Sequence, residues 1–280
     1  MKVTYKSLIM LAAISTGLVA CEKNLLENAI PETFPNDPTM SYVKFIHAYA
    51  GKAPALTSGA GPAMFLYSGT QKLNSNATNA FAWAAFGGQF PAPSSATTNA
   101  RSWYCALQYG STTFYGVQAR VSGSTPAPVA GDTVFRRTVA LEGGKSYVAV
   151  FGDTAQSPSI TMLPDDYGTL TENKYKIRLA NFLAWPDDVQ ELYSTREGRV
   201  IQSNITYKTA GNYIELDRPR ISDTLIIRKV SGSSPGTYAI NIFGFFPTGK
   251  RAYTVFTRGK QLTGTSTVFQ NISTIVTTNY

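Results

Sequence analysis

The chain is short of the residue types on which most catalytic and metal sites are built. It has two cysteines, Cys21 and Cys105, and a single histidine, His47, among 280 residues. Zinc sites built on clusters of histidine and cysteine are therefore excluded, and a histidine-dependent triad would have to use His47. The sequence Gly59-Ala60-Gly61-Pro62 lacks the lysine and the helix of a phosphate-binding loop.

Charged residues are also scarce, at 15% of the chain. The net charge of +8 is dispersed in pairs such as Arg136-Arg137 and Lys250-Arg251 instead of being gathered in a run. A nucleic-acid surface would need a basic stripe interleaved with exposed aromatics. Paired cations at strand edges more often keep an exposed edge from pairing, so we predict no nucleic-acid partner.

The residue types that are abundant are those typical of an all-β exported protein. The chain has 23 Gly, 16 Tyr and 15 Phe, and its apolar stretches are short and separated by turn residues. These stretches predict strands, of which the clearest cover residues 42–48, 64–67, 113–121, 134–141 and 146–151. Gly143-Gly144 predicts a β-hairpin turn between the last two.

The N-terminus carries the most specific pattern. Lys2 and Lys6 precede an apolar stretch that is too short for a membrane span, and small Ala20 stands just before Cys21. This resembles the lipobox of bacterial lipoproteins, which implies removal of residues 1–20 and acylation of Cys21. We therefore predict a cell-envelope protein on the outer membrane, whose acylated cysteine binds the membrane.

The chain beyond the signal divides into a tether and a repeated body. Residues 21–40 carry three prolines and no periodicity, and we expect an extended tether there. Three segments of the first half have counterparts in the second half in the same order: residues 43–48 with 177–182, 144–151 with 249–256 when one inserted residue is allowed, and 159–163 with 273–277. They predict two homologous β-domains, at 41–166 and 172–280. The stretch 70–100 is predicted to be a long insertion in the first domain.

The strand pattern of both copies resembles a known family. Each copy opens with alternating hydrophobic and basic residues that end on His47 or Asn181, and closes with a Gly-Lys turn and a tyrosine-bearing strand. This resembles the bacterial domain of unknown function 4397. The resemblance implies exported proteins, often lipoproteins of Bacteroidota, with tandem immunoglobulin-like β-sandwiches and no established catalytic residues. The opening loops, 49–54 and 183–188, depart from the family's Ser-Pro-Asp-Ala-Pro pattern.

The remaining polar residues do not form a recognisable catalytic or metal pattern. The acidic pairs Asp165-Asp166 and Asp187-Asp188 lack the spacing and central glycine of a calcium loop, and we expect the second pair to close a turn. His47 aligns with Asn181, which favours a structural role at the strand end. Cys105 lies in an apolar strand and is expected to be an inert thiol. We therefore predict no cofactor, no metal and no enzyme activity.

Two groups of residues are left as candidates for a surface function. Four aromatic residues in or beside the insertion either stack on sugar rings or a protein partner, or fill the cores and pack the insertion onto the body: Trp83, Phe86, Trp103 and Tyr104. Three threonines each follow an aspartate, as in the O-glycosylation acceptor of Bacteroidota: Thr133, Thr154 and Thr224.

The leading functional prediction is a non-enzymatic binding or structural module displayed at the envelope, with a protein or a glycan as partner. One alternative is a glycan-binding accessory protein for polysaccharide capture, which predicts a line of coplanar exposed aromatics. The other alternative is a hydrolase. It requires a concave pocket with two acids, or with His47 exposed at its base.

Overall fold

The computed structural model describes residues 37–48, 64–73, 89–90, 104–118, 133–152, 159–183, 185–234, 237–259 and 273–279. Within these ranges the chain forms eighteen strands and no helix. The predicted all-β sandwich architecture is confirmed. It follows that no helix of the described part could cross a membrane.

The strands fall into two sets of nine. The first set is β1 (Met40–His47), β2 (Met64–Ser68), β3 (Gln71–Lys72), β4 (Gln89–Phe90), β5 (Cys105–Gln108), β6 (Gly110–Gln118), β7 (Thr133–Leu141), β8 (Ser146–Gly152) and β9 (Ser159–Pro164). The second set is β10 (Lys174–Leu183), β11 (Val189–Ser194), β12 (Arg199–Ile205), β13 (Thr209–Ala210), β14 (Ile214–Asp217), β15 (Asp223–Ser231), β16 (Ala239–Phe245), β17 (Arg251–Gly259) and β18 (Ser273–Asn279).

The second set repeats the pairing scheme of the first. Sheet A has the order β4-β1-β8-β9 with β5 also on β1, and sheet B has the order β3-β2-β6-β7. Sheet C has the order β13-β10-β17-β18 with β14 also on β10, and sheet D has the order β12-β11-β15-β16. Each strand of the second set thus takes the place of the strand nine positions earlier. The pairs β1–β8 and β10–β17 are parallel, and all other pairs are antiparallel.

The strand register reproduces the sequence alignment of the two halves. Val43 pairs with Tyr147 across β1 and β8, and Ile177 pairs with Tyr253 across β10 and β17. Lys44 and Arg178 are therefore equivalent positions. The predicted domain limits, 41–166 and 172–280, stay a prediction. Of the predicted insertion over 70–100, only residues 70–73 and 89–90, which include β3 and β4, belong to the described residues.

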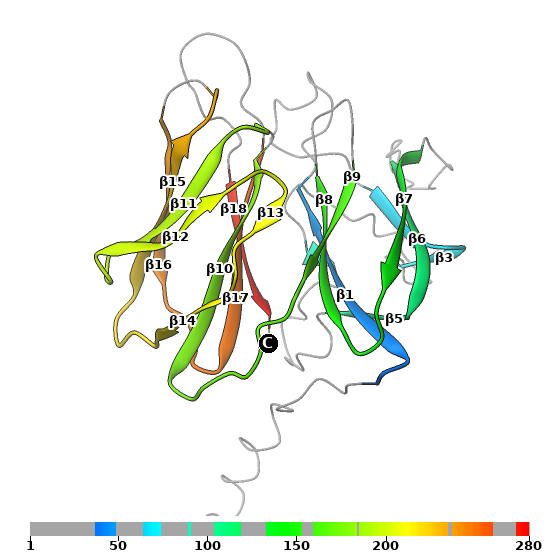
Figure 1. Cartoon of the computed structure of the whole chain (residues 1–280), viewed down its shortest axis with the longest axis horizontal. Coiled ribbons are helices and arrows are strands. Elements are labelled where there is room, and N and C mark those ends of the chain that lie inside the picture. The colour runs from blue at the N-terminus through cyan, green and yellow to red at the C-terminus, as the bar shows by residue number, and fades with distance from the viewer. Residues whose placement is uncertain are drawn as a thin grey trace, which may run out of the picture.

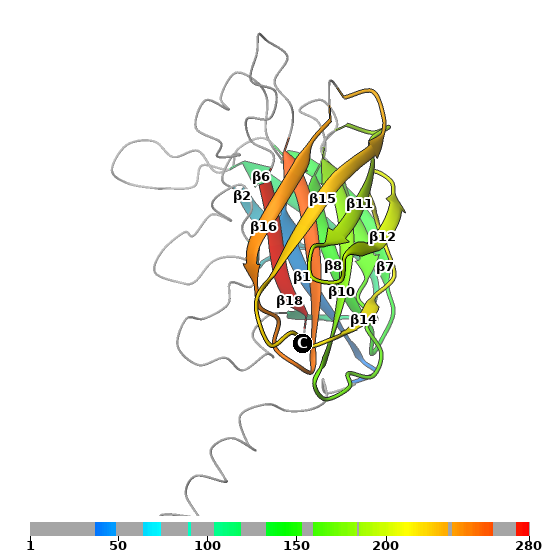
Figure 2. The same ribbon diagram turned by 90° about the vertical axis from the view of Figure 1, so that its left-hand side faces the viewer.

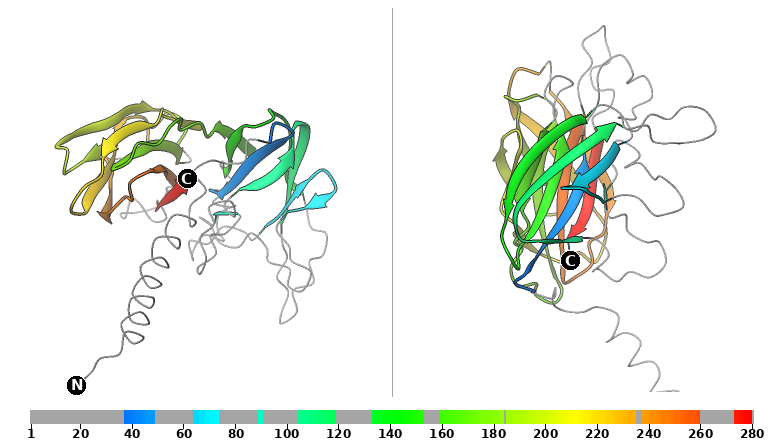
Figure 3. Two further views of the ribbon diagram at one scale, coloured as in Figure 1. Left: turned by 90° about the horizontal axis from the view of Figure 1, so that it is seen from below. Right: turned by 90° about the vertical axis from the view of Figure 1, so that its right-hand side faces the viewer.

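The four sheets stack as layers in the order D, C, A, B (Figure 1). Sheets A and B enclose one apolar core, which includes Val43, Phe45 and Phe114. Sheets C and D enclose a second, which includes Ile177 and Leu192. The side view shows sheet D in front of sheet C, and the view from below shows the two sandwiches side by side (Figures 2 and 3).

A third apolar cluster joins the two sandwiches. Side chains alternate along a strand, so Val43 and Phe45 point into their own core while Lys44 and Ile46 point out of it. That outer face of sheet A packs on the outer face of sheet C, where Ile46 and its neighbours meet Phe182 and Phe256. For this reason β1 and β10 are buried on both faces along nearly their whole length.

The Gly143-Gly144 turn differs from its prediction. The two glycines do form a turn, with Gly144 at a φ of 72°, but β7 belongs to sheet B and β8 to sheet A. The predicted β-hairpin is therefore wrong: the turn carries the chain from one sheet of the sandwich to the other. Turn residues encode a local reversal and not the partner of the next strand. A Cβ on Gly143 would lie 1.9 Å from the carbonyl oxygen of Pro38.

Candidate functional site at the junction of the two sandwiches

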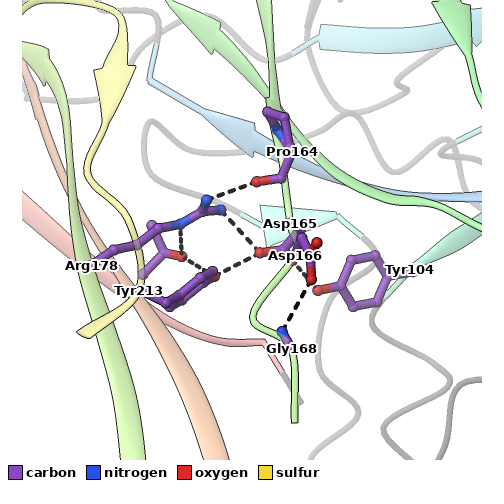
Figure 4. Close-up of polar contacts among 8 residues, drawn as sticks. Tyr104, Pro164, Asp165, Asp166, Gly168, Arg178 and Tyr213 are labelled. Atoms are coloured by element: carbon purple, nitrogen blue, oxygen red, sulfur yellow. Dashed lines mark hydrogen bonds and ion pairs between the residues drawn. The ribbon is translucent and has the colours of Figure 1, made fainter. Parts of the chain in front are cut away.

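A cluster of buried ionisable groups lies where the two sandwiches meet (Figure 4). The side chains of Lys44 and Arg178 project from the outer faces of β1 and β10, at equivalent positions of the repeat. Asp165 directly follows β9, at the start of the segment that links the sandwiches. The exposed fractions are 0% for Lys44, 5% for Arg178 and 3% for Asp165. The sequence therefore brings two cations and a carboxylate into one water-poor junction.

Asp165 is the centre of this cluster. The hydroxyl of Tyr104 donates a hydrogen bond to its Oδ2, and the hydroxyl of Tyr213 donates one to its Oδ1 over 2.6 Å. Nη2 of Arg178 donates to the same Oδ1 over 3.0 Å. Tyr104 belongs to the first sandwich and Tyr213 to the second, so this carboxylate accepts hydrogen bonds from both halves.

Arg178 is held in one orientation by three further contacts. Its Nη1 donates to the carbonyl oxygen of Pro164 over 2.7 Å, and its Nε donates to Oγ1 of Thr254 over 3.0 Å. Its guanidinium lies over the ring of Tyr213, with Cζ 4.3 Å from the ring centroid. A guanidinium suits this place because its planar fork satisfies several acceptors at once and stacks on an aromatic face.

The first sandwich presents a parallel arrangement. Nζ of Lys44 lies 4.5 Å from the centroid of the Tyr104 ring. Tyr104 and Tyr213 occupy equivalent positions, because Val43 pairs with Cys105 and Ile177 pairs with Ile214. Each half of the protein therefore stacks a cation of its first strand on the tyrosine that precedes the antiparallel neighbour of that strand.

Burial shifts the proton affinity of these groups. The pKa of Lys44 is lowered to about 7, mainly because burial removes water from its amine. The nearby charge of Asp165 raises this pKa, and the charge of Arg178 lowers it. Burial, and then the negative charge of Asp165, hold the pKa of Tyr104 and Tyr213 well above 10. Both phenols are therefore neutral donors at physiological pH.

An open groove of about 530 Å³ lies beside the cluster. Arg178 and Tyr213 form part of its lining together with Lys176, Tyr167 and Asn212. Nζ of Lys176 donates to the carbonyl oxygen of Tyr167 over 2.6 Å, and the groove is lined by both polar and apolar groups. Asp165 itself does not line it.

The chemistry open to this cluster is limited by its bonds. Lys44 has no exposed surface, so no substrate can reach its amine. Asp165 accepts three hydrogen bonds and Arg178 donates three. A general acid or base needs a proton-transfer partner within reach, and here the partners are other members of the cluster. The arrangement is that of a polar clamp between two sandwiches.

His47 and Cys105, the histidine and the cysteine of the described part, are both placed in packed surroundings. His47 is fully buried and packs edge-on against Phe151, with 5.6 Å between ring centroids. Its equivalent, Asn181, donates from Nδ2 to the carbonyl oxygens of Asp188 and Ile205. Burial raises the pKa of the half-buried Cys105 thiol to about 12, so the thiol stays protonated.

The acidic pair Asp187-Asp188 connects the turn before β11 to the segment that follows β15. Asp187 accepts a hydrogen bond from the backbone of Ser233, and Asp188 accepts two from Ser234, one of them from its hydroxyl over 2.6 Å. Nζ of Lys229 lies 3.7 Å from Asp188. Among the described residues no group of three His, Cys, Asp or Glu side chains is arranged to hold a metal ion.

The predicted surface candidates are only partly within the described residues. Cys21, Trp83, Phe86, Trp103 and Thr154 lie outside them. Tyr104 is 5% exposed and belongs to the buried junction, where Lys44 covers its ring, so it offers no surface platform for a ligand. Of the predicted glycosylation sites, Thr133 is exposed at the start of β7 and Thr224 is half-buried in β15.

A second aromatic arrangement, on the outer face of sheet B, was not singled out by the sequence. The rings of Tyr67 and Tyr115 are stacked, with 4.6 Å between centroids and 2° between planes. They are cross-strand neighbours in a row that continues to Lys72 on one side and to Arg136 on the other. The right-hand view of Figure 3 shows this sheet at the front. The row could have been predicted only with the strand register in hand.

Comparison with known proteins adds little to this picture. No protein-family model and no curated protein matches the chain, so the resemblance to domain of unknown function 4397 stays a prediction. Two solved structures that match are candidate cell adhesion proteins of Bacteroides fragilis and Bacteroides ovatus, 8% and 11% identical to this chain. Both alignments cover 86% of this chain, and 97% and 96% of the respective structures, with a TM-score of 0.19. Scores this low carry no argument about function.

Proposed function

We propose that the protein is a lipid-anchored module of the cell envelope with a non-enzymatic binding or structural role. The observation that supports this proposal is the junction, where buried ionisable groups bond to one another and connect the two sandwiches. A rigid two-sandwich body displays the loops and outer sheet faces at fixed positions, as a recognition module requires.

Fatty-acid labelling tests the anchor. The wild-type protein, expressed at full length in cells fed a labelled fatty acid, is expected to carry the label, and Cys21→Ser is expected to lose essentially all of it, because the thiol is the acceptor. Cys105→Ser serves as the matched control, since it removes the other cysteine and should leave labelling unchanged. Label retained by Cys21→Ser, or absent from the wild type, refutes the anchor.

A second candidate function is capture of an acidic glycan on the outer face of sheet B. The four strands of this sheet contain no aspartate or glutamate, and Lys72 and Arg136 lie in the row of the stacked tyrosines. Arg137 points to the other face and donates a hydrogen bond to the carbonyl oxygen of Ile160. The stacked tyrosines stand between two of these cations, and the guanidinium of Arg136 is exposed. Tyrosine hydroxyls and a guanidinium together suit the hydroxyls and carboxylates of a uronate-bearing chain.

Affinity electrophoresis of the full-length protein in acidic and in neutral polysaccharide tests this candidate. Arg136→Gln is expected to weaken retardation by the acidic polymer about tenfold, because one charge-assisted hydrogen bond is lost. Arg199→Gln removes another exposed arginine, on sheet D, and should have no effect. Equal retardation of all three proteins, or retardation by the neutral polymer alone, would remove sheet B from consideration.

A further inference from the structure

Four of the six exposed large apolar side chains of the described residues lie toward one end of the molecule. Ile221 is 72% exposed, Phe243 76%, Phe246 51% and Tyr109 60%. Ile221 lies between β14 and β15, and Phe246 follows β16, whose last residue pairs with the first residue of β15. Tyr109 lies between β5 and β6, next to the start of β1. Such side chains cost free energy in water and mark a contact surface when they gather.

The N-terminal chain leaves the body at this same end. Asp37 is the first described residue, and its carbonyl oxygen accepts a hydrogen bond from the backbone of Met40, where β1 begins. Figure 1 shows the start of β1 (dark blue), β5 and β14 at the lower end of the two sandwiches. A lipid on Cys21 would therefore be joined to the body at this end.

The loops of this end also carry positive charge. The segments 218–222 and 246–250 contain three exposed cations and no carboxylate: Arg218, Arg220 and Lys250. The guanidinium of Arg218 lies over the Phe246 ring, with Cζ 5.7 Å from the centroid. The acids that flank the first segment in the chain are engaged elsewhere: Asp217 lies 3.9 Å from Nζ of Lys174, and Asp223 accepts hydrogen bonds from the hydroxyls of Ser194 and Thr195. Apolar tips beside cations are the pattern of a surface that enters the headgroup layer of an anionic bilayer.

We propose that this end is a membrane-contact patch, made of Ile221, Phe243, Phe246, Arg218 and Arg220, which rests on the surface of an anionic phospholipid bilayer. The apolar tips enter the boundary between headgroups and acyl chains, and the two arginines contact lipid phosphates. The orientation of the body rests on the anchor proposed above, because the lipid on Cys21 delivers the patch to the surface. The patch then fixes the orientation of the outer sheet faces relative to the membrane.

The two ends of β15 supply a matched pair of probe sites. Ile221 lies two residues before the strand begins and Val230 is its penultimate residue, and both are well exposed, at 72% and 51%. In full-length, acylated protein reconstituted in vesicles of phosphatidylethanolamine and phosphatidylglycerol, a fluorophore on Ile221→Cys is expected to be quenched by headgroup spin-labelled lipid. A fluorophore on Val230→Cys is expected to be quenched several-fold less. Equal quenching at the two sites, or none at residue 221, overturns the proposal.

A second measurement separates failure of the patch from failure of the anchor. The full-length Cys21→Ser chain is floated with vesicles that contain or lack phosphatidylglycerol, alongside the same chain carrying Phe246→Ser and Arg220→Gln. The patch predicts that the added pair of substitutions lowers flotation with anionic vesicles at least threefold and leaves flotation with neutral vesicles unchanged. No difference with anionic vesicles refutes the patch whatever the labelling of Cys21 shows.

Discussion

Asp165→Asn is expected to lower the free energy of unfolding by about 3 kcal/mol, because it leaves the buried guanidinium of Arg178 without its counter-charge. Asparagine has nearly the same shape but only one acceptor oxygen, so it keeps the hydrogen bonds at one oxygen position and places an amide nitrogen, which cannot accept, at the other. The loss therefore reports on the missing counter-charge together with one hydrogen bond. Urea denaturation of the full-length protein, followed by tyrosine and tryptophan fluorescence, measures it.

Asp166→Asn is the matched control for this measurement. Asp166 is the next residue in the chain, but it is exposed, and among the described residues it accepts a hydrogen bond from the backbone of Gly168. Its substitution is expected to change the unfolding free energy by less than about 0.5 kcal/mol. If the two substitutions have equal effects, the buried carboxylate does not hold the sandwiches together.

Lys44 is expected to make the protein more stable as the pH rises from about 7 toward 10. In the folded protein Lys44 loses its proton at a pKa of about 7, whereas in the unfolded chain it does so near 10.5. Between these values the unfolded chain binds a proton that the folded one does not, so raising the pH favours folding. The slope is about 1 kcal/mol per pH unit.

The charged and titratable groups that face Lys44 narrow the pH range over which stability rises, but they do not turn the rise into a fall. Asp165 raises the pKa of Lys44 and Arg178 lowers it, and both contributions are smaller than that of burial. Tyr104 and Tyr213 keep their protons in the folded state, so they oppose folding only where unfolded tyrosine ionises, near pH 10. The rise is therefore expected between about pH 7 and 9.5.

Lys44→Met tests this assignment. It is expected to abolish the rise and to increase the unfolding free energy at pH 6 by about 2 kcal/mol, because a buried charge is replaced by an apolar chain of similar length. Lys145→Met, which changes an exposed lysine on the turn before β8, should leave the slope as it is. A slope that survives Lys44→Met would show that another group carries it.

Much of the fold could be predicted because the strand pattern is local. Alternating side chains identified the segments of β1 and β8, and the alignment of 43–48 with 177–182 proved to be the alignment of the strand registers. The pairing of strands across a turn was beyond that reasoning. Gly143-Gly144 predicted a hairpin, yet β7 and β8 lie in different sheets, because a turn motif does not specify hydrogen-bond partners.

The candidate site could be predicted only in fragments. The sequence singled out Tyr104 as a surface aromatic and Asp165 as one of an acidic pair, and it aligned Lys44 with Arg178 without assigning either a role. Nothing local connects them: Tyr104 and Asp165 are 61 residues apart in the chain. The informative signal was a basic residue at the same place within each apolar opening strand.

The sequence by itself determined that this protein is built of strands, that its second half repeats its first, and which positions of the two halves correspond, because these properties depend on side-chain periodicity and spacing along the chain. Only the tertiary structure decided that the outer faces of sheets A and C pack on each other. That packing buries Lys44, Arg178 and Asp165, so that these polar residues form a water-poor cluster between the two sandwiches. Burial on both faces of β1 and β10 depends on a second sheet that no pattern within either strand specifies.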